Sequence, residues 1–482
     1  MLHHTLQYLA VRVANGLLAV GTLSVFTHVL TTEQFGRYSL GLATANVIAS
    51  IGFQWIAIAA NRFHAGNDGD TRGLRRELRR LWLIAAAIIA ALGATAAGLT
   101  SWSRADVSGA TITLVTLAAI AMGLFNLQLQ LVNAAGKPLQ YGKLTVSRAA
   151  LLLGLGYVLT HQGGAHDAVL FALGASALVA TTSFGTTFLA VSGWSSDPEI
   201  RRKLVRFGMP LALVYAATMT IDMADRLLLG AIHGSAAVAG YSAAYDLAQQ
   251  SLGALLNVFM LAGFPQVVAA WERNGAQGAR LAFQPMINGV LLVGGAATSL
   301  FVGCATEVSH LIFSDHIAGQ AKLVLPWIAA ATAIGGLRNY LFDIALQLEH
   351  RTNSQFTITL VMAATNILFG VLLIPEYEAR GAAWSAFGAL TLGAACTAWT
   401  TRHLGFWKKL PVELVKIIAC ACVSIAGGEY VTGQWTLQPL NSVLALIVKG
   451  SMVMMLFAAL ALLLNAANAR RSITLLIRRV SP

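Results

Sequence analysis

Charged residues are scarce in this sequence. Only 11% of its 482 residues are Asp, Glu, Lys or Arg, whereas a soluble protein carries about a quarter. Hydrophobic residues make up 57%, and the mean hydropathy is +0.68. This balance excludes an ordinary soluble domain and predicts an all-α, polytopic membrane protein.

Residue patterns typical of metal, redox or catalytic sites are missing. None of the 11 histidines pairs with a carboxylate at metal-ligand spacing inside an apolar run. The predicted outer loops are too short to form a catalytic domain. We therefore expect no enzymatic activity, no metal and no cofactor. The four cysteines lack a metal or redox spacing and are interpreted as small apolar side chains: Cys304, Cys396, Cys420 and Cys422.

Apolar runs of about 20 residues predict 14 membrane spans. The first six lie near 6–29, 37–60, 81–101, 109–133, 143–160 and 167–192. The next six lie near 207–231, 237–266, 283–304, 321–348, 355–374 and 381–401, and the last two near 412–431 and 442–464. We expect an N-terminal lobe (1–200), a C-terminal lobe (201–402), each of six helices, and a C-terminal helix pair with a basic tail (403–482).

Basic residues gather in every second loop. Arg72, Arg75, Arg76, Arg79 and Arg80 lie between spans two and three, Arg201, Arg202, Lys203 and Arg206 between six and seven, and Arg402, Lys408 and Lys409 between twelve and thirteen. The positive-inside rule then places both termini in the cytoplasm, in a cell inner membrane. The membrane topology thus explains the net charge of +12, which therefore does not indicate nucleic-acid binding. The N-terminal segment lacks signal-peptide features, so we interpret it as a retained helix.

A short internal repeat links the two halves. The segment FGRYSLGLATAN (35–46) aligns with VAGYSAAYDLAQ (238–249), and each follows a short predicted outer turn. This offset matches span one to span seven and span two to span eight. Parallel repeats of this kind place a substrate site between the lobes, near the middle of the bilayer.

Three arginines fall inside predicted spans. Arg12, with Asn15 nearby, lies about two turns into span one, Arg148 about one turn into span five, and Arg338, beside Asn339, past the middle of span ten. An isolated arginine in hydrocarbon costs at least ~2.5 kcal/mol, so these residues need polar partners. A guanidinium matches phosphate oxygens, which predicts contacts with a phosphate head group. Alternatively, Arg12 and Arg148 extend to the cytoplasmic head groups.

Span seven carries charges near its far end. Pro210 is placed in its first turn, where proline is tolerated. Asp222, Asp225 and Arg226 then interrupt the apolar run. They either face a protein cavity, as a coupling or gating group, or anchor the helix at the wetted outer interface.

Span eight carries a polar stripe. Asp246, Gln250 and Asn257 are spaced four and seven apart, so they are expected on one helical face. Burial would raise the affinity of Asp246 for a proton, which suits ion coupling. An interhelical hydrogen bond is the structural alternative.

The order of the motifs resembles a known family. In span seven, a proline, an apolar run and an Asp-Arg pair are followed by a short turn and the motif GYSAAY. Three other segments agree with this order: HVLTTEQFGRYSLGLATAN (28–46), FPQVVAAWERNG (264–275) and LIPEYEARGAAWSAFGAL (373–390). This order resembles the Wzx-type polysaccharide flippases of the multidrug/oligosaccharidyl-lipid/polysaccharide exporter superfamily.

The resemblance implies alternating access that carries an undecaprenyl-(pyro)phosphate-linked oligosaccharide from the cytoplasmic to the outer leaflet. It further implies a cationic cavity, possible coupling to H⁺ or Na⁺, and use in cell-surface polysaccharide synthesis, such as O-antigen or exopolysaccharide. Implied partners are membrane lipids, a polysaccharide polymerase and chain-length regulators. Two alternatives stay open: an ion-coupled multidrug exporter, whose often cationic substrates suit buried arginines poorly, and a membrane polymerase or ligase, which would need a large outer loop.

Overall fold

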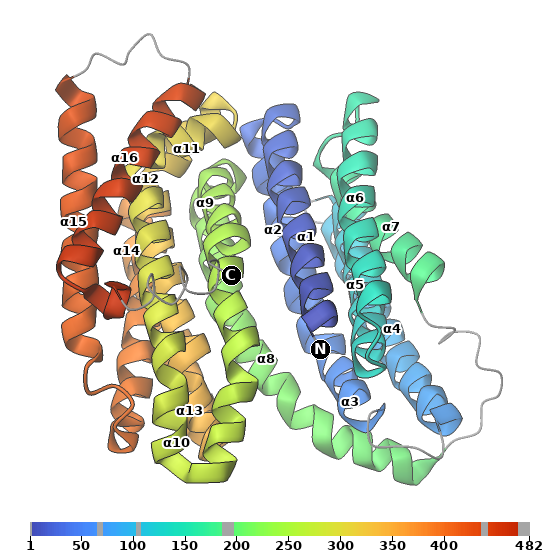
Figure 1. The fold of residues 1–482 in the computed structure, drawn as a ribbon. Coiled ribbons are helices and arrows are strands. Elements are labelled where there is room, and N and C mark those ends of the chain that lie inside the picture. The colour runs from blue at the N-terminus through green and yellow to red at the C-terminus, as the bar shows by residue number, and fades with distance from the viewer. Residues whose placement is uncertain (1, 65–70, 103–107, 186–196, 435–441, 471–482) are drawn as a thin grey trace. The chain divides into compact units, whose positions relative to one another are not determined.

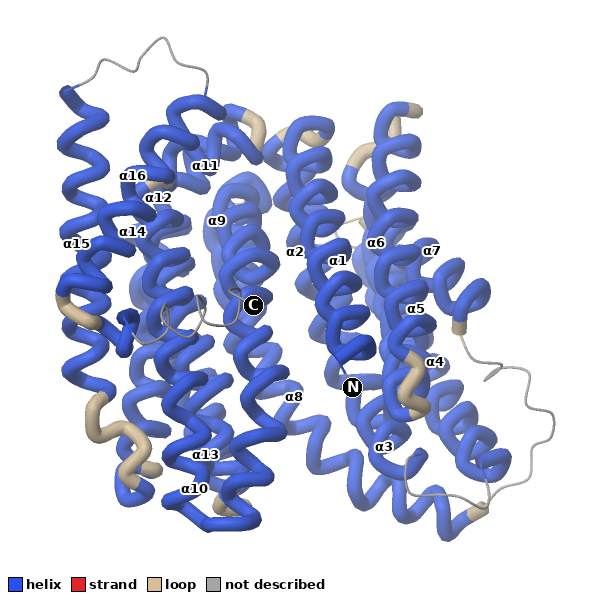
Figure 2. Tube along the Cα trace, in the orientation of Figure 1, coloured by secondary structure: helices blue, strands red, loops and turns tan. Residues whose placement is uncertain are grey.

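The computed structural model describes residues 2–64, 71–102, 108–185, 197–434 and 442–470. Those residues form helices and no strand (Figures 1 and 2). The chain divides into two compact units, Met1–Ala239 (unit 1) and Gly240–Pro482 (unit 2). The prediction of an all-α polytopic protein is confirmed.

The described residues of unit 1 form eight α-helices and one short π-helical turn. They are α1 (Leu2–Val29), α2 (Thr32–Ala49), η1 (Ser50–Gln54, π), α3 (Trp55–His64), α4 (Thr71–Trp102), α5 (Gly109–Ala134), α6 (Pro138–His161), α7 (His166–Phe184) and α8 (Pro198–His233). Helix α9 (Ser235–Ala248) begins in unit 1 and continues into unit 2.

Unit 2 contains two further π-helical turns. Its elements are η2 (Gln249–Gly253, π), α10 (Ala254–Gly303), α11 (Ala305–Ile312), α12 (Asp315–Leu337), η3 (Arg338–Phe342, π), α13 (Asp343–Leu348), α14 (Thr352–Thr400), η4 (Arg402–Leu404, 3₁₀), α15 (Leu410–Gln434), α16 (Ser442–Leu463) and η5 (Ala466–Asn468, 3₁₀).

The expected membrane spans correspond to helices. Within the described residues, eleven helical segments are long and apolar enough to cross a membrane. Two of them fold back on themselves. The backbone of α10 leaves the helical region at Asn274 and Gly275, and that of α14 does so at Glu378. Each therefore supplies two expected spans, and α1 supplies the first. The end of the sixth expected span, 186–192, lies outside the described residues.

Helix α2 begins at a complete capping box. The Thr31 hydroxyl accepts a hydrogen bond from the Gln34 backbone N–H (3.3 Å), and the Gln34 side chain accepts one from the Thr31 N–H (3.2 Å). One turn further, Gly36 packs against the backbone carbonyl of Ser235 so closely that a Cβ would collide with it. Glycine is therefore required where α2 meets the α8–α9 turn.

The aligned repeat segments share a local structure. Tyr38 and Ser39 are buried in α2, as are Tyr241 and Ser242 in α9. A π-helical turn follows each segment, η1 after α2 and η2 after α9. Single π turns inside α-helices often accompany functional sites.

The predicted position of Pro210 at a helix start is wrong. Helix α8 begins twelve residues earlier, where the Asp197 carboxylate accepts hydrogen bonds from the Glu199 N–H (2.9 Å) and the Ile200 N–H (3.1 Å). Pro198 occupies the first turn instead. The basic segment before span seven is thus helical, and Pro210 interrupts the hydrogen-bond ladder within it.

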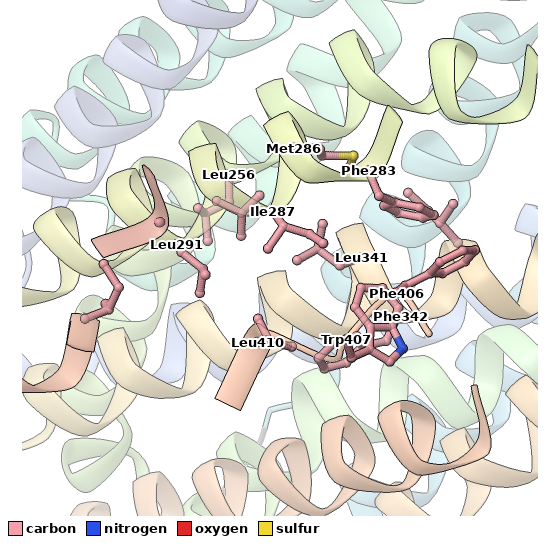
Figure 3. Close-up of a cluster of buried hydrophobic side chains, with 14 of the residues drawn as sticks. Leu256, Phe283, Met286, Ile287, Leu291, Leu341, Phe342, Phe406, Trp407 and Leu410 are labelled. Carbon is pink, nitrogen blue, oxygen red and sulfur yellow. The ribbon is translucent and has the colours of Figure 1, made fainter. Parts of the chain in front are cut away.

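The core of unit 2 contains a cluster of aromatic side chains (Figure 3). The ring of Phe283, from α10, lies with its centroid 5.0 Å from that of Phe406, and Phe342 of η3 lies 4.8 Å from Trp407. Trp407 and Phe406 belong to the segment between α14 and α15. This packing fixes that segment against α10 and η3.

Candidate functional site

Unit 2 contains a cavity of about 1350 Å³. Both arms of α10, the segment before α15, helix α16 and the turn η5 line it. The polar lining residues are Gln277, Arg280, Gln284, Asn288, Lys408, Lys409 and Asn468. The apolar lining residues include Leu255, Phe259, Leu292, Val293, Leu300, Met454 and Phe457.

Polarity changes along this cavity. Arg280 lies just after the break in α10, at the end that also holds Lys408 and Lys409. Gln284 and Asn288 follow, and beyond them the lining of α10 is apolar as far as Leu300. From Gln277 to that leucine the helix rises about 35 Å, close to the ~30 Å hydrocarbon thickness. An apolar channel with a cationic mouth suits a long hydrocarbon chain that carries an anionic head.

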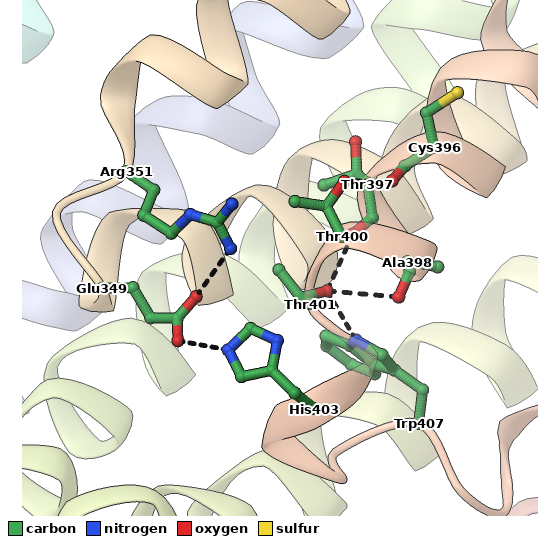
Figure 4. Close-up of polar contacts among 9 residues, drawn as sticks. All are labelled: Glu349, Arg351, Cys396, Thr397, Ala398, Thr400, Thr401, His403 and Trp407. Carbon is green, nitrogen blue, oxygen red and sulfur yellow. Dashed lines mark hydrogen bonds and ion pairs between the residues drawn. The ribbon is translucent and has the colours of Figure 1, made fainter.

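Hydrogen bonds order the segment that presents the two lysines (Figure 4). The Thr401 hydroxyl accepts a hydrogen bond from the Trp407 indole N–H (2.9 Å). Gly405 adopts a left-handed conformation (φ 69°), which allows the tight turn between them. Lys408 and Lys409 follow directly and are both exposed.

A carboxylate joins this segment to the end of α13. The Glu349 carboxylate lies 2.6 Å from His403 Nε2 and 3.7 Å from Arg351 Nη1 (Figure 4). Because Glu349 follows α13 and His403 follows α14, the contact ties two helix ends together on the side where the lysines lie. The cationic mouth therefore has a fixed framework.

A strained turn closes the same end of the cavity. Asn465, Ala467 and Asn468 all have positive φ values (47°, 48° and 56°). The Glu413 carboxylate accepts a hydrogen bond from the Ala467 N–H (2.6 Å), and Arg470 donates to backbone carbonyls at the end of α16. Strained residues of this kind persist only where their surroundings hold them, often at functional sites.

The sequence did not identify this cavity as a binding site. In the sequence pattern Lys408 and Lys409 serve only as topology markers, and no pattern distinguishes Arg280. The available signal was the proximity of these cations to the starts of apolar spans nine and thirteen.

The predicted site residue Arg338 lies inside unit 2, as the first residue of η3. It is 5% exposed, and its Nη2 donates a hydrogen bond to the Thr359 hydroxyl (2.8 Å). The same nitrogen lies 3.5 Å from an Asp343 carboxylate oxygen. Within the described residues, Arg338 Nε has no hydrogen-bond partner. The neighbouring predicted residue, Asn339, is exposed.

Asp343 is a buried carboxylate that sequence reasoning missed. It is 5% exposed, and one of its oxygens has no hydrogen-bond partner in the described part of the chain. Residues five apart diverge on an α-helix, whereas a π-helix pairs residues i and i+5. The π turn η3 therefore brings Arg338 and Asp343 together.

Two other predicted arginines lie in unit 1. Arg12 is half-buried in α1, as is Asn15. Arg148 is also half-buried, and its guanidinium lies 4.8 Å from the centroid of the Phe125 ring. Helix α6 begins at Pro138, so Arg148 lies about three turns from the start of the helix. Its side chain packs on the Phe125 ring of α5, which weakens the interpretation that it extends to the cytoplasmic head groups.

The charged residues of span seven lie within α8. Asp225 and Arg226 are each 1% exposed, so they do not lie at a wetted interface. Asp222 is half-buried. Their burial favours a role inside the protein over anchoring at the surface.

The polar stripe of span eight is interrupted by a π turn. Asp246 is half-buried, and Gln250 is exposed. Because η2 (Gln249–Gly253) lies between Asp246 and Asn257, the π turn rotates Asn257 roughly a quarter turn away from the expected common face. Within the described residues, no group of three or more His, Cys, Asp or Glu could hold a metal ion.

Comparisons with known proteins identify a family that this sequence matches. A family described as "Polysaccharide biosynthesis protein" matches residues 1–271. No curated protein sequence matches the chain.

Several solved structures share the fold. Lipid II flippase MurJ in an inward closed conformation has a TM-score of 0.72 at 10% identity, covering 96% of this chain and 99% of MurJ. An inward-facing multidrug resistance MATE family transporter of the MOP superfamily has a TM-score of 0.59 at 16% identity, covering 84% of this chain and 99% of the transporter. A MOP superfamily transporter from Pyrococcus furiosus has a TM-score of 0.53 at 14% identity, covering 84% of this chain and 95% of the transporter. These neighbours are a flippase and transporters, not enzymes.

Proposed function

Because this chain belongs to the polysaccharide biosynthesis protein family and shares the fold of a lipid flippase and of MOP transporters, we propose that it flips a lipid-linked oligosaccharide. The substrate is an undecaprenyl-(pyro)phosphate-linked repeat unit, and the direction is from the cytoplasmic to the outer leaflet. The membrane is the cell inner membrane, with both termini cytoplasmic, as the charge pattern of the loops predicts.

The amphipathic cavity of unit 2 carries this proposal. Its mouth, with Arg280, Lys408 and Lys409, lies on the side that the charge pattern assigns to the cytoplasm. A phosphate enters charge-assisted hydrogen bonds there. The isoprenoid chain follows the apolar lining, while the hydrophilic sugar stays outside the hydrocarbon.

Translocation by alternating access then requires polar partners deeper in the protein. Arg12 and Arg148 in unit 1 and Arg338 in unit 2 are the cations that we assign to the phosphate. For Arg338 this implies exchange of partners, since Asp343 neutralises it in the conformation described here. Asp246 is the carboxylate that we assign to ion coupling, with H⁺ or Na⁺ as the ion.

The repeat unit would serve cell-surface polysaccharides such as O-antigen or exopolysaccharide, and a polymerase and chain-length regulators would act on the product. The competing function is export of small molecules. The cluster of cations at the cavity mouth disfavours cationic drugs, because like charges repel.

The decisive experiment uses the full chain in proteoliposomes with a fluorescent, short-sugar undecaprenyl pyrophosphate. The double variant Lys408→Gln/Lys409→Gln should slow flipping roughly tenfold, the effect of losing a charge-assisted contact. Arg402→Gln is the matched control, since Arg402 is exposed in the same segment but stacks on the Trp399 ring (3.6 Å) outside the cavity. Equal rates in the double variant and the wild type, or an equal loss in the control, would refute the assignment.

A further inference from the structure

Unit 1 contains a second cavity, of about 980 Å³. Helices α2, α4 and α5, the first residue of α7 and the α8–α9 turn enclose it. Its polar lining residues include Glu33, Arg37, Ser108, Thr111, His166 and His233. Its apolar lining residues include Leu40, Ile48, Ile89, Leu92, Ile112 and Val115.

This cavity also has a polar end and an apolar end. Glu33 and Arg37 lie in the first turns of α2, whereas Ile48 lies near its end. The helical rise from Thr32 to Ile48 is about 24 Å. That length matches one leaflet with its head groups, about half of 40–45 Å. The polar end is opposite the basic first turns of α4 (72–80), so it lies on the predicted outer side.

The rim presents charges of both signs. Arg37 Nη2 lies 2.7 Å from the Glu33 carboxylate, and both side chains are largely exposed (44% and 59%). Next to the lining residues Thr111 and His166, the Asp167 carboxylate accepts a hydrogen bond from the Thr111 hydroxyl (2.8 Å) and lies 3.5 Å from His166 Nε2.

One rim atom has hydrogen-bonding capacity left over. His166 Nδ1 is buried and, within the described residues, has no hydrogen-bond partner. A buried ring nitrogen without a partner is unfavourable. A ligand at the rim would satisfy it.

We propose that this cavity binds a phospholipid of the outer leaflet whose head group carries both a phosphate and an ammonium, as phosphatidylethanolamine does. Arg37 and His166 take the phosphate oxygens, and the Glu33 carboxylate takes the ammonium. An acyl chain lies along Leu92. The Glu33 carboxylate at the rim and the Asp167 carboxylate next to His166 disfavour a head group with only negative charge.

Head group and chain contribute differently to this site. Lipid tails are as apolar as the side chains that line the cavity, so the transfer of an acyl chain from the bilayer into the cavity changes the free energy little. The acyl chain therefore contributes shape complementarity, and the ionic contacts of the head group contribute selectivity. Lipid binding at this cavity is independent of which substrate the protein transports.

The test measures lipid retained on the purified full-length chain by native mass spectrometry. Four probes are compared: phosphatidylethanolamine, phosphatidylglycerol and diacylglycerol with identical chains, and soluble glycerophosphoethanolamine. Phosphatidylethanolamine should be retained best. Equal retention of diacylglycerol would show that the head group is not recognised. Preference for phosphatidylglycerol would show a site for anionic lipids. Equal binding of the soluble head group would show that the acyl chains are not needed. Each of these results would overturn the proposal.

Variants locate the bound lipid. Arg37→Gln should weaken retention of phosphatidylethanolamine roughly tenfold, because it removes a charge-assisted contact. Leu92→Trp should abolish retention by filling the cavity. Leu99→Trp is the matched control, since Leu99 lies on the same helix with the same exposure (66% against 65%) but outside the cavity. Retention unchanged in Leu92→Trp, or lost equally in Leu99→Trp, would place the lipid elsewhere.

Discussion

Removing one partner of the Arg338–Asp343 pair should destabilise unit 2 more than removing both. Each residue is 5% exposed, and their closest charged atoms are 3.5 Å apart. At that distance, with an effective dielectric constant near 20, the attraction is about 5 kcal/mol. A lone charge left in this environment keeps its desolvation penalty and loses that attraction.

The expected cost of Arg338→Met or Asp343→Asn alone is therefore about 3–5 kcal/mol. This corresponds to roughly a hundredfold to a few thousandfold in the unfolding equilibrium. In the double variant Arg338→Met/Asp343→Asn no buried charge remains, so stability should return close to that of the wild type. The difference between the summed single effects and the double effect measures the coupling directly.

The assay is thermal unfolding of the purified full-length chain in one detergent, with membrane abundance as a second readout. The control is Lys203→Met, which removes a partner of the exposed pair with Glu199 (61% and 78% exposed). It should leave unfolding unchanged, because exposed pairs contribute little. If both single variants unfold like the wild type, or if the double variant is as unstable as either single variant, the reasoning fails.

The double variant also tests the substrate role of Arg338. A stable double variant that no longer exports polysaccharide would show that the pair has a role in export beyond stability. A stable and active one would limit Arg338 to a structural role.

Three further outcomes are expected. In a cysteine-free background, Gly73→Cys should resist a membrane-impermeant maleimide in intact cells while Ser235→Cys reacts, and labelling of the former would reverse the topology. Asp246→Asn should keep membrane abundance but lose export and its dependence on external pH, and a wild-type pH profile would make Asp246 structural. Glu413→Gln should lower unfolding stability by about 1–3 kcal/mol, because the Ala467 N–H loses a charged acceptor, and unchanged melting would show that packing alone holds the turn.

The sequence was sufficient for the helical architecture because its signals are local. Apolar length predicts each span, and a cap such as Thr31 with Gln34 sets a helix start. Hydropathy, however, marks where lipid begins and not where a helix begins. Helices α6 and α8 extend several residues into the basic cytoplasmic flanks, so both begin earlier than their expected spans, and Pro210 lies inside α8 and not at its start.

The candidate sites were less predictable, for two physical reasons. The lysines at the cavity mouth satisfy the positive-inside rule by themselves, so their sequence pattern carries no separate sign of binding. The Arg338–Asp343 pair escaped notice because its spacing of five residues does not match α-helical periodicity. The cavities join segments far apart in the chain, such as Arg280 and Lys408, and nothing in a single sequence relates those positions.

The π turn η3 has a consequence for natural variation in length. Such a turn amounts to one residue inserted into an α-helix, and it shifts the angular phase of everything that follows by about 100°. Deleting one residue between Arg338 and Asp343 would rebuild a continuous α-helix and rotate α13 on its axis, turning Ile344 and the residues beyond it out of the core. A substitution at the same place alters one side chain, whereas the deletion alters the register of a whole helix end. Length at this position should therefore be held more strictly than residue identity, and a chain one residue shorter here would need a compensating insertion within the same turn.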